Sequence, residues 1–173
     1  MDTTKTKSKT RITKNLMPNT NSSTIKVQKR DGRLEDLDIN KIHFVVEEAC
    51  EGLTGVSSSQ IEMNANIQFY DGMTTKDIQN VLVRSANDLI SLETPNYQYA
   101  AARLLSYDVR KEAHGQYEYT PLLKLILRNI RSGVYDKSIL EKYTKTEIKK
   151  FNTWIKRERD LKFTYAGLRQ ICD

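Results

Sequence analysis

Several side chains in this sequence have the chemistry to hold a polyphosphate, although they lie far apart along the chain. Lys29 and Arg30 precede Asp31-Gly32, a dipeptide that favours a tight hairpin turn because glycine tolerates positive φ. Thr75 lies where a helix is expected to begin, and a helix N-terminus favours an anion. Lys111 lies near the end of a later helix. If the fold returns Lys111 toward Lys29 and Arg30, these groups converge on a triphosphate.

Other reactive arrangements are missing from the sequence. Neither GxxxxGK[ST] nor GxGxxG occurs, so the two common phosphate-cradling loops are absent. The only histidines, His43 and His114, are interpreted as structural or surface residues. The only cysteines, Cys50 and Cys172, are too few for a disulfide framework or a zinc site and fit a reducing compartment. We therefore expect no catalytic residue and no metal ligand in this chain.

The frame predicted for the anion-binding side chains is a short hairpin followed by four helices. Apolar residues at three- and four-residue spacing, with their caps and breakers, place these helices at about 40–52, 57–71, 74–90 and 95–114. Asp38 is expected to cap the first helix, Thr74 the third, and Pro95 to occupy the first position of the fourth. The second helix is ambiguous, because apolar residues alternate from Ile61 to Phe69 as in a strand. The fold class is mainly α, with a compact domain at residues 25–115.

The two ends of the chain differ from this domain. Residues 1–24 are rich in Thr, Lys, Ser and Asn, and we expect a disordered basic tail. Residues 116–173 predict further helices, one opened by Pro121 and one capped by Thr144, with apolar faces that lack a partner. This segment is interpreted as the helical start of a larger domain that is cut off.

The charge distribution argues against nucleic acid as the main partner. The net charge is +6, but residues 25–115 carry ten basic and fourteen acidic side chains. The middle domain thus lacks the basic face that binding to a phosphate backbone requires. No apolar run approaches the roughly 20 residues of a membrane span, and no secretory signal is present, so a cytoplasmic location is expected.

Several ordered motifs together resemble the ATP-cone in the large subunit of class I ribonucleotide reductases. The resemblance begins with VQKRDG at 27–32 and continues past the cone into the first helices of the reductase domain. Its other parts are DINKIH at 38–43, IQFYDGMTTKDI at 67–78, PNYQYAAARL at 95–104, RK at 110–111, GQ at 115–116, YT at 143–144 and ERD at 158–160. It covers about residue 25 to the end of the chain.

The resemblance implies an allosteric domain with a hairpin capped by a four-helix bundle. Its effectors would be ATP as activator and dATP as inhibitor, with Mg²⁺ accompanying the nucleotide. The implied partners are the remainder of the large subunit, if it is a separate polypeptide, and a radical-generating small subunit, within an oligomer. The nucleotide-contacting positions that it implies are Val27, Lys29, Arg30, Glu35, Asp36, Leu37, Asp38, Ile39, Asn40, Lys41, Thr75 and Lys111.

Two departures from the family pattern bear on function. Gln79 stands where related reductases often have a histidine lining the nucleotide pocket, which puts inhibition by dATP in doubt. The reductase barrel with its catalytic cysteines lies beyond residue 173 in the family. We therefore expect that this chain alone does not reduce a nucleotide, and that it is a truncated or split subunit or a remnant.

Three alternatives remain open at this point. A transcriptional regulator with an ATP-cone would need a zinc ribbon of four cysteines, which the sequence lacks. A helical adaptor would use the basic C-terminal helices on an acidic partner and bind no nucleotide. Nucleic-acid binding through the tail and the C-terminal helices predicts a steep dependence on salt.

Overall fold

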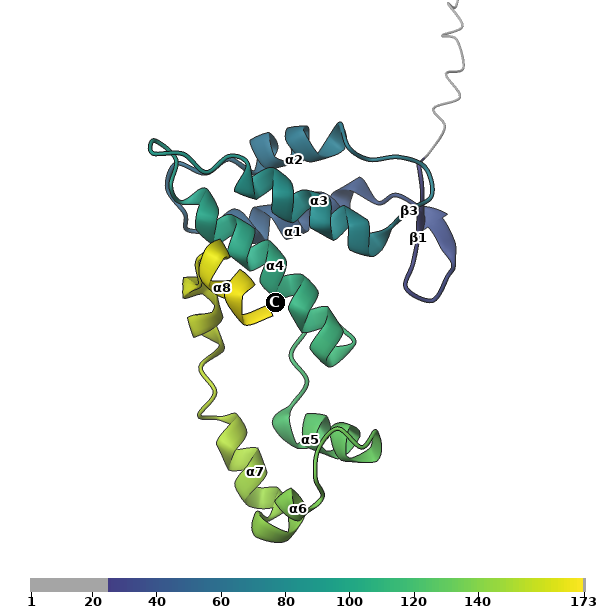
Figure 1. Cartoon of the computed structure of the whole chain (residues 1–173), viewed down its shortest axis with the longest axis vertical. Coiled ribbons are helices and arrows are strands. Elements are labelled where there is room, and N and C mark those ends of the chain that lie inside the picture. The colour runs from purple at the N-terminus through teal and green to yellow at the C-terminus, as the bar shows by residue number, and fades with distance from the viewer. Residues whose placement is uncertain (1–24, 173) are drawn as a thin grey trace, which may run out of the picture.

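The computed structural model describes residues 25–172, so the tail predicted for residues 1–24 lies outside the described residues. Figure 1 shows a small sheet beside a group of helices, and one long helix, α4, that runs from this group toward a second helical lobe. The long helix spans Tyr97–His114 and ends where Gly115 adopts a left-handed φ of 72°. The described fold is mainly helical, as predicted.

The sheet contains three strands, where a two-stranded hairpin was predicted. Strand β1 (Lys26–Gln28) pairs antiparallel with β2 (Leu34–Asp36), and Gly32 supplies the positive φ of 85° in the turn between them. On its other edge, β1 pairs in parallel with β3 (Met73–Thr74), which places Val27 opposite Met73. The predicted hairpin is confirmed, and only β3 was not predicted, because its two residues are too few to show any alternation.

Side-chain caps define the first three helices. Helix α1 (Ile39–Cys50) is capped by Asp38, α2 (Ser58–Asn66) by Ser57, and α3 (Thr75–Asn87) by Thr74. The caps at Asp38 and Thr74 match the prediction. The segment whose apolar residues alternate as in a strand is helical in the structure. Ile61 and Ala65, four residues apart, are buried, while Met63 and Ile67 are exposed.

Some helix boundaries differ from the prediction, most of all the end of α2. Helix α2 ends at Asn66, well before Asp71-Gly72, and the intervening chain leads into β3. Helix α4 begins at Tyr97, so Pro95 lies in a preceding turn, where its carbonyl accepts a hydrogen bond from the N–H of Gln98.

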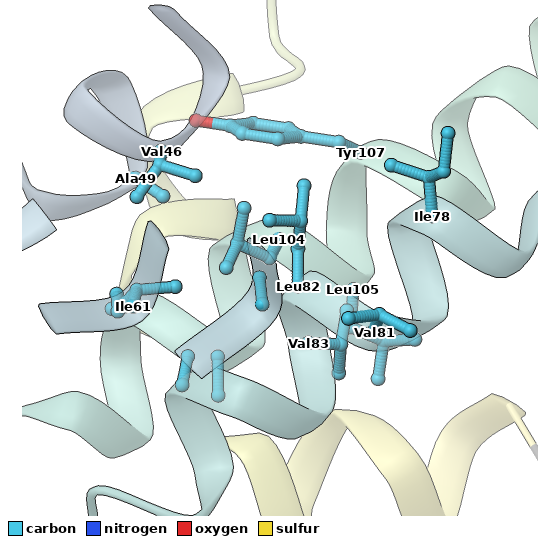
Figure 2. Packing of buried hydrophobic residues seen from close by; sticks show 14 of the residues in the cluster. Val46, Ala49, Ile61, Ile78, Val81, Leu82, Val83, Leu104, Leu105 and Tyr107 are labelled. Carbon is cyan, nitrogen blue, oxygen red and sulfur yellow. The ribbon is translucent and has the colours of Figure 1, made fainter. Parts of the chain in front are cut away.

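The core lies among the first four helices: α1 and α3 pack against α4, and α2 packs against α1 and α3. Figure 2 shows Leu104, Leu105 and Tyr107 of α4 facing side chains from the other helices. Tyr97 is buried as well, and its hydroxyl donates to Oε1 of Gln60 (2.6 Å) and accepts from the N–H of Ser57 (3.0 Å). Cys50 packs against this core, and burial raises the pKa of its thiol to about 11, which agrees with an unreactive core residue.

The residues that follow α4 form a second lobe, and the chain then returns to pack beside α4. Helices α5 (Leu122–Arg131), α6 (Ser138–Lys142) and α7 (Lys145–Asn152) make up the lobe, in which α5 packs against α7. The 3₁₀ helix η1 (Arg157–Lys162) and helix α8 (Tyr165–Cys172) then lie beside α4 (Figure 1). Leu168 of α8 joins the core, so this helix finds a partner.

Within residues 25–172 no helix is both long and apolar enough to cross a bilayer. The same residues contain no group of three or more His, Cys, Asp or Glu side chains arranged to hold a metal ion.

Candidate functional site

An open cavity of about 150 Å³ lies where the sheet meets the N-terminus of α3, the start of α1 and the end of α4. Nine of the twelve positions implied by the family resemblance line it. They are Val27, Lys29, Glu35, Asp36, Leu37, Asp38, Lys41, Thr75 and Lys111. A ligand larger than a few water molecules must extend through its mouth or displace its walls.

Two lysines from distant parts of the chain supply positive charge to the cavity. Lys29 follows β1, and its ammonium pairs with Glu35 at 3.2 Å. Lys111 comes from the last turn of α4 and is partly buried. Burial lowers the pKa of Lys111, the positive charges of Arg30 and Lys29 lower it further, and Asp108 opposes them. These cations are close enough to repel one another, which favours an anionic ligand between them.

The N-terminus of α3 adds backbone donors on the same side. Thr74 accepts a hydrogen bond from the N–H of Asp77 at 3.0 Å and fixes the first turn. Thr75, the first helical residue, lines the cavity. The free N–H groups of a helix start and its dipole favour negative charge at this position.

The segment from β2 to α1 forms the opposite wall and carries carboxylates. Asp38 caps α1 by accepting from the N–H of Lys41 (3.3 Å), and its carboxylate also pairs with the Lys41 ammonium at 3.3 Å. The Lys41 contacts hold the pKa of Asp38 below its usual range. Carboxylate oxygens here can accept hydrogen bonds from hydroxyl groups, whereas the lysines across the cavity suit phosphates.

Three of the positions implied by the resemblance do not line the cavity. Arg30 instead pairs with Asp108 at 3.0 Å and ties the hairpin to α4. Ile39 and Asn40 are exposed in the first turn of α1. Arg30 can thus support the site by fixing the hairpin against the helix that carries Lys111.

Apolar residues that were assigned only to the core also form part of the cavity wall. Ile42 and Val45 of α1 face it together with Ile78 and Leu82 of α3. Their helical spacing predicted a buried face, but it held no sign that the face borders a cavity. Gln79 lines it as well, buried, and its side-chain amide donates to the carbonyl of Leu104 at 2.8 Å.

A larger groove of about 830 Å³ lies elsewhere, between α5, α7 and the segment after α4. It contains none of the twelve implied positions. We take the smaller cavity as the candidate nucleotide site because two lysines, several carboxylates and the N-terminus of α3 come together there from separate elements.

Comparison with known protein families identifies the region of the chain that contains this cavity. The model of the ATP cone domain family matches residues 25–112, which include the sheet, α1 to α3 and most of α4. The chain belongs to the ATP-cone family. The cavity described above lies wholly within the matched residues.

Individual relatives extend the similarity beyond the ATP-cone. Ribonucleoside-diphosphate reductase 1 subunit alpha of Escherichia coli is 45% identical over 145 residues, 84% of this chain and 19% of that protein. The subunit alpha of Haemophilus influenzae is 39% identical over 150 residues, 87% of this chain and 20% of that protein. The subunit alpha of Enterobacteria phage T4 is 40% identical over 147 residues, 85% of this chain and 19% of that protein. The chain thus spans about a fifth of the length of these relatives.

Proposed function

We propose that this chain is the N-terminal allosteric region of a ribonucleoside-diphosphate reductase large subunit, and that its ATP-cone binds ATP as activator and dATP as inhibitor. The observation that carries the proposal is the convergence of Lys29, Lys111 and the N-terminus of α3 on one cavity within the matched family region. Because the relatives are reductase subunits, regulation of deoxyribonucleotide synthesis is the corresponding role.

The triphosphate would lie between the two lysines and the start of α3. Lys29 would exchange its contact with Glu35 for a phosphate, and Lys111, now repelled by neighbouring cations, would gain a counter-charge. Thr75 would present backbone N–H groups to the same phosphates. A Mg²⁺ ion bound by the nucleotide would offset charge that two lysines leave unmatched.

The base and sugar would lie against the β2–α1 wall. Asp36 and Asp38 offer acceptors for ribose hydroxyls, and Ile42 and Ile78 offer an apolar surface for the adenine ring. ATP and dATP differ only at the 2′-hydroxyl, so their opposite effects must come from a small difference in this wall that biases subunit association.

Gln79 bears on that difference. Its amide is held by the Leu104 carbonyl, and glutamine neither carries charge nor stacks as an imidazole does. We propose that nucleotide binding is retained and that inhibition by dATP is weakened. A dATP inhibition curve of ordinary depth in the assembled enzyme would contradict this part of the proposal.

The remaining assignments follow from the relatives. The completed enzyme would need the catalytic part of the large subunit, on this or a separate polypeptide, and a radical-generating small subunit. We propose a cytoplasmic oligomer of these components. The described residues supply regulation alone.

Calorimetric titration of the intact chain with ATP and with dATP tests the proposal. Lys29→Ala and Lys111→Ala should each abolish or strongly weaken binding, because each removes a cation facing the phosphates. Arg84→Ala is the matched control, since Arg84 is exposed at the far end of α3 and does not line the cavity. Absence of binding by the folded chain, or equal binding by all three variants, would refute a working nucleotide site here.

A further inference from the structure

The large groove between α5 and α7 carries unmatched positive charge. Lys124 and Arg131 of α5 and Lys149 of α7 line it, and none of the three makes a side-chain hydrogen bond or ion pair with any residue in 25–172. No carboxylate side chain lines the groove. No side chain of residues 122–152 forms an ion pair with another residue in 25–172, so this lobe does not neutralise its own cations in that way.

The floor of the groove is apolar and its shape is fixed by hydrogen bonds. Leu122, Leu123 and Leu127 line it, each half-buried. Asn152 of α7 accepts from the N–H of Leu122 at 2.9 Å and holds the two helices together. Arg128 donates to the His114 carbonyl at 2.9 Å and also to that of Ala113, which fixes α5 to the end of α4. A leucine floor with a basic rim is thus built into the lobe.

The rim is strongly positive. Partial burial lowers the pKa of His114, a groove residue, and the charges of Arg157, Arg128 and Arg110 lower it further. The charged residues that line the groove, Lys124, Arg128, Arg131 and Lys149, are all basic. An occupant must therefore bring acidic groups along with apolar ones.

We infer that the groove between α5 and α7 docks an acidic amphipathic segment of a partner polypeptide, with leucine-like side chains on the floor and carboxylates against Lys124, Arg131 and Lys149. A polypeptide fits better than nucleic acid because the floor offers half-buried leucines rather than aromatic stacking surfaces.

The relatives show where such a segment can originate. About four fifths of each relative's length lies outside the matched region, so a reductase contains further polypeptide that can supply such a segment. The inference does not depend on the nucleotide cavity, which lies on other elements.

The test is fluorescence anisotropy of the intact chain with a labelled helical peptide of Leu and Glu, in which Leu recurs at i, i+3, i+4 and i+7. A peptide with Lys in place of Glu and one with Ser in place of Leu serve as controls, as does a single-stranded oligonucleotide. We expect saturable binding of the Leu/Glu peptide alone.

Lys149→Glu should weaken binding of the Leu/Glu peptide by about tenfold or more, because it places a carboxylate against the ligand's own. Lys150→Glu is the matched control: Lys150 is exposed in the same helical turn but does not line the groove. Binding of the Leu/Lys peptide or of the oligonucleotide as tight as that of the Leu/Glu peptide would overturn the inference. Equal loss in both variants, or no saturable binding of the Leu/Glu peptide by the folded chain, would overturn it too.

Discussion

At the scale of single residues, Lys111 is the side chain whose position in the fold most directly supports phosphate binding. It reaches the cavity from the end of α4, where burial and two neighbouring cations lower its pKa. A lysine with a lowered pKa destabilises the folded protein: the full cost applies below the folded pKa, and it disappears as the pH rises from there to the ordinary value of 10.5. A triphosphate would supply a counter-charge. Lys111 would therefore lower the stability of the free protein and raise its affinity for the nucleotide.

This predicts how nucleotide affinity depends on pH. Because Lys111 loses its proton below the ordinary lysine value of 10.5, ATP affinity should begin to fall between neutral pH and that value. In Lys111→Arg the guanidinium stays protonated, so the fall should move to higher pH. Calorimetry across this interval measures both profiles. Parallel profiles for the two proteins would show that Lys111 does not face the phosphates.

The sequence predicted the charged and polar residues of the site, but not the apolar residues that form the cavity wall. The charges of Lys29 and Lys111, and the expected helix start at Thr75, predict an anion site, and all three residues line the cavity. Ile78 and Leu82 have the spacing of core residues, and spacing alone cannot distinguish a buried face from the wall of a cavity. The ion pair of Arg30 with Asp108 spans 78 residues and left no local signal.

At the scale of elements, the N-terminus of α3 organises the site. Thr74 both accepts from the N–H of Asp77 at 3.0 Å and donates to its carboxylate at 2.6 Å. The capping pattern is local, so the sequence predicted it. The pairing of β3 with β1 joins Met73 to Val27 across 46 residues, and no local pattern encodes such a contact.

We predict that Thr74→Ala lowers the free energy of unfolding by about 1 kcal/mol, the usual cost of losing a side-chain cap. Because α3 then frays at the cavity, ATP affinity should fall as well. Urea unfolding and calorimetry check the two effects. Ser57→Ala removes the longer 3.4 Å cap of α2, away from the cavity, and should leave ATP affinity unchanged. Loss of affinity in both variants would mean that the effect is not local to α3.

At the scale of the whole molecule, the last helix closes back on the first domain. Although the family match ends at residue 112, Leu168 of α8 is only 8% exposed and packs into the core around α4. Tyr119 donates a hydrogen bond to Asp160 of η1, which joins the two segments that connect the lobe to α4. The apolar periodicity of this region predicted helices, but not which surface α8 covers.

Leu168→Ala should therefore destabilise the ATP-cone itself, by about 2–3 kcal/mol, because it leaves a cavity in the shared core. Ile171→Ala on the same helix should change stability by less than about 0.5 kcal/mol, since Ile171 is 69% exposed. Thermal or urea unfolding of the intact chain, followed by a probe in the cone such as Cys50 labelling, measures both. Equal effects of the two substitutions would show that α8 does not belong to this core.

The most direct test of the account is to map the ATP-induced changes in backbone amide chemical shifts on the intact, isotopically labelled chain. We predict saturable shifts at Lys29, through the β2–α1 segment, at Thr75 and at Lys111, with none in the groove between α5 and α7. Shifts that concentrate in that groove, or no saturable shifts in a folded chain, would contradict the assignment of the cavity as the nucleotide site.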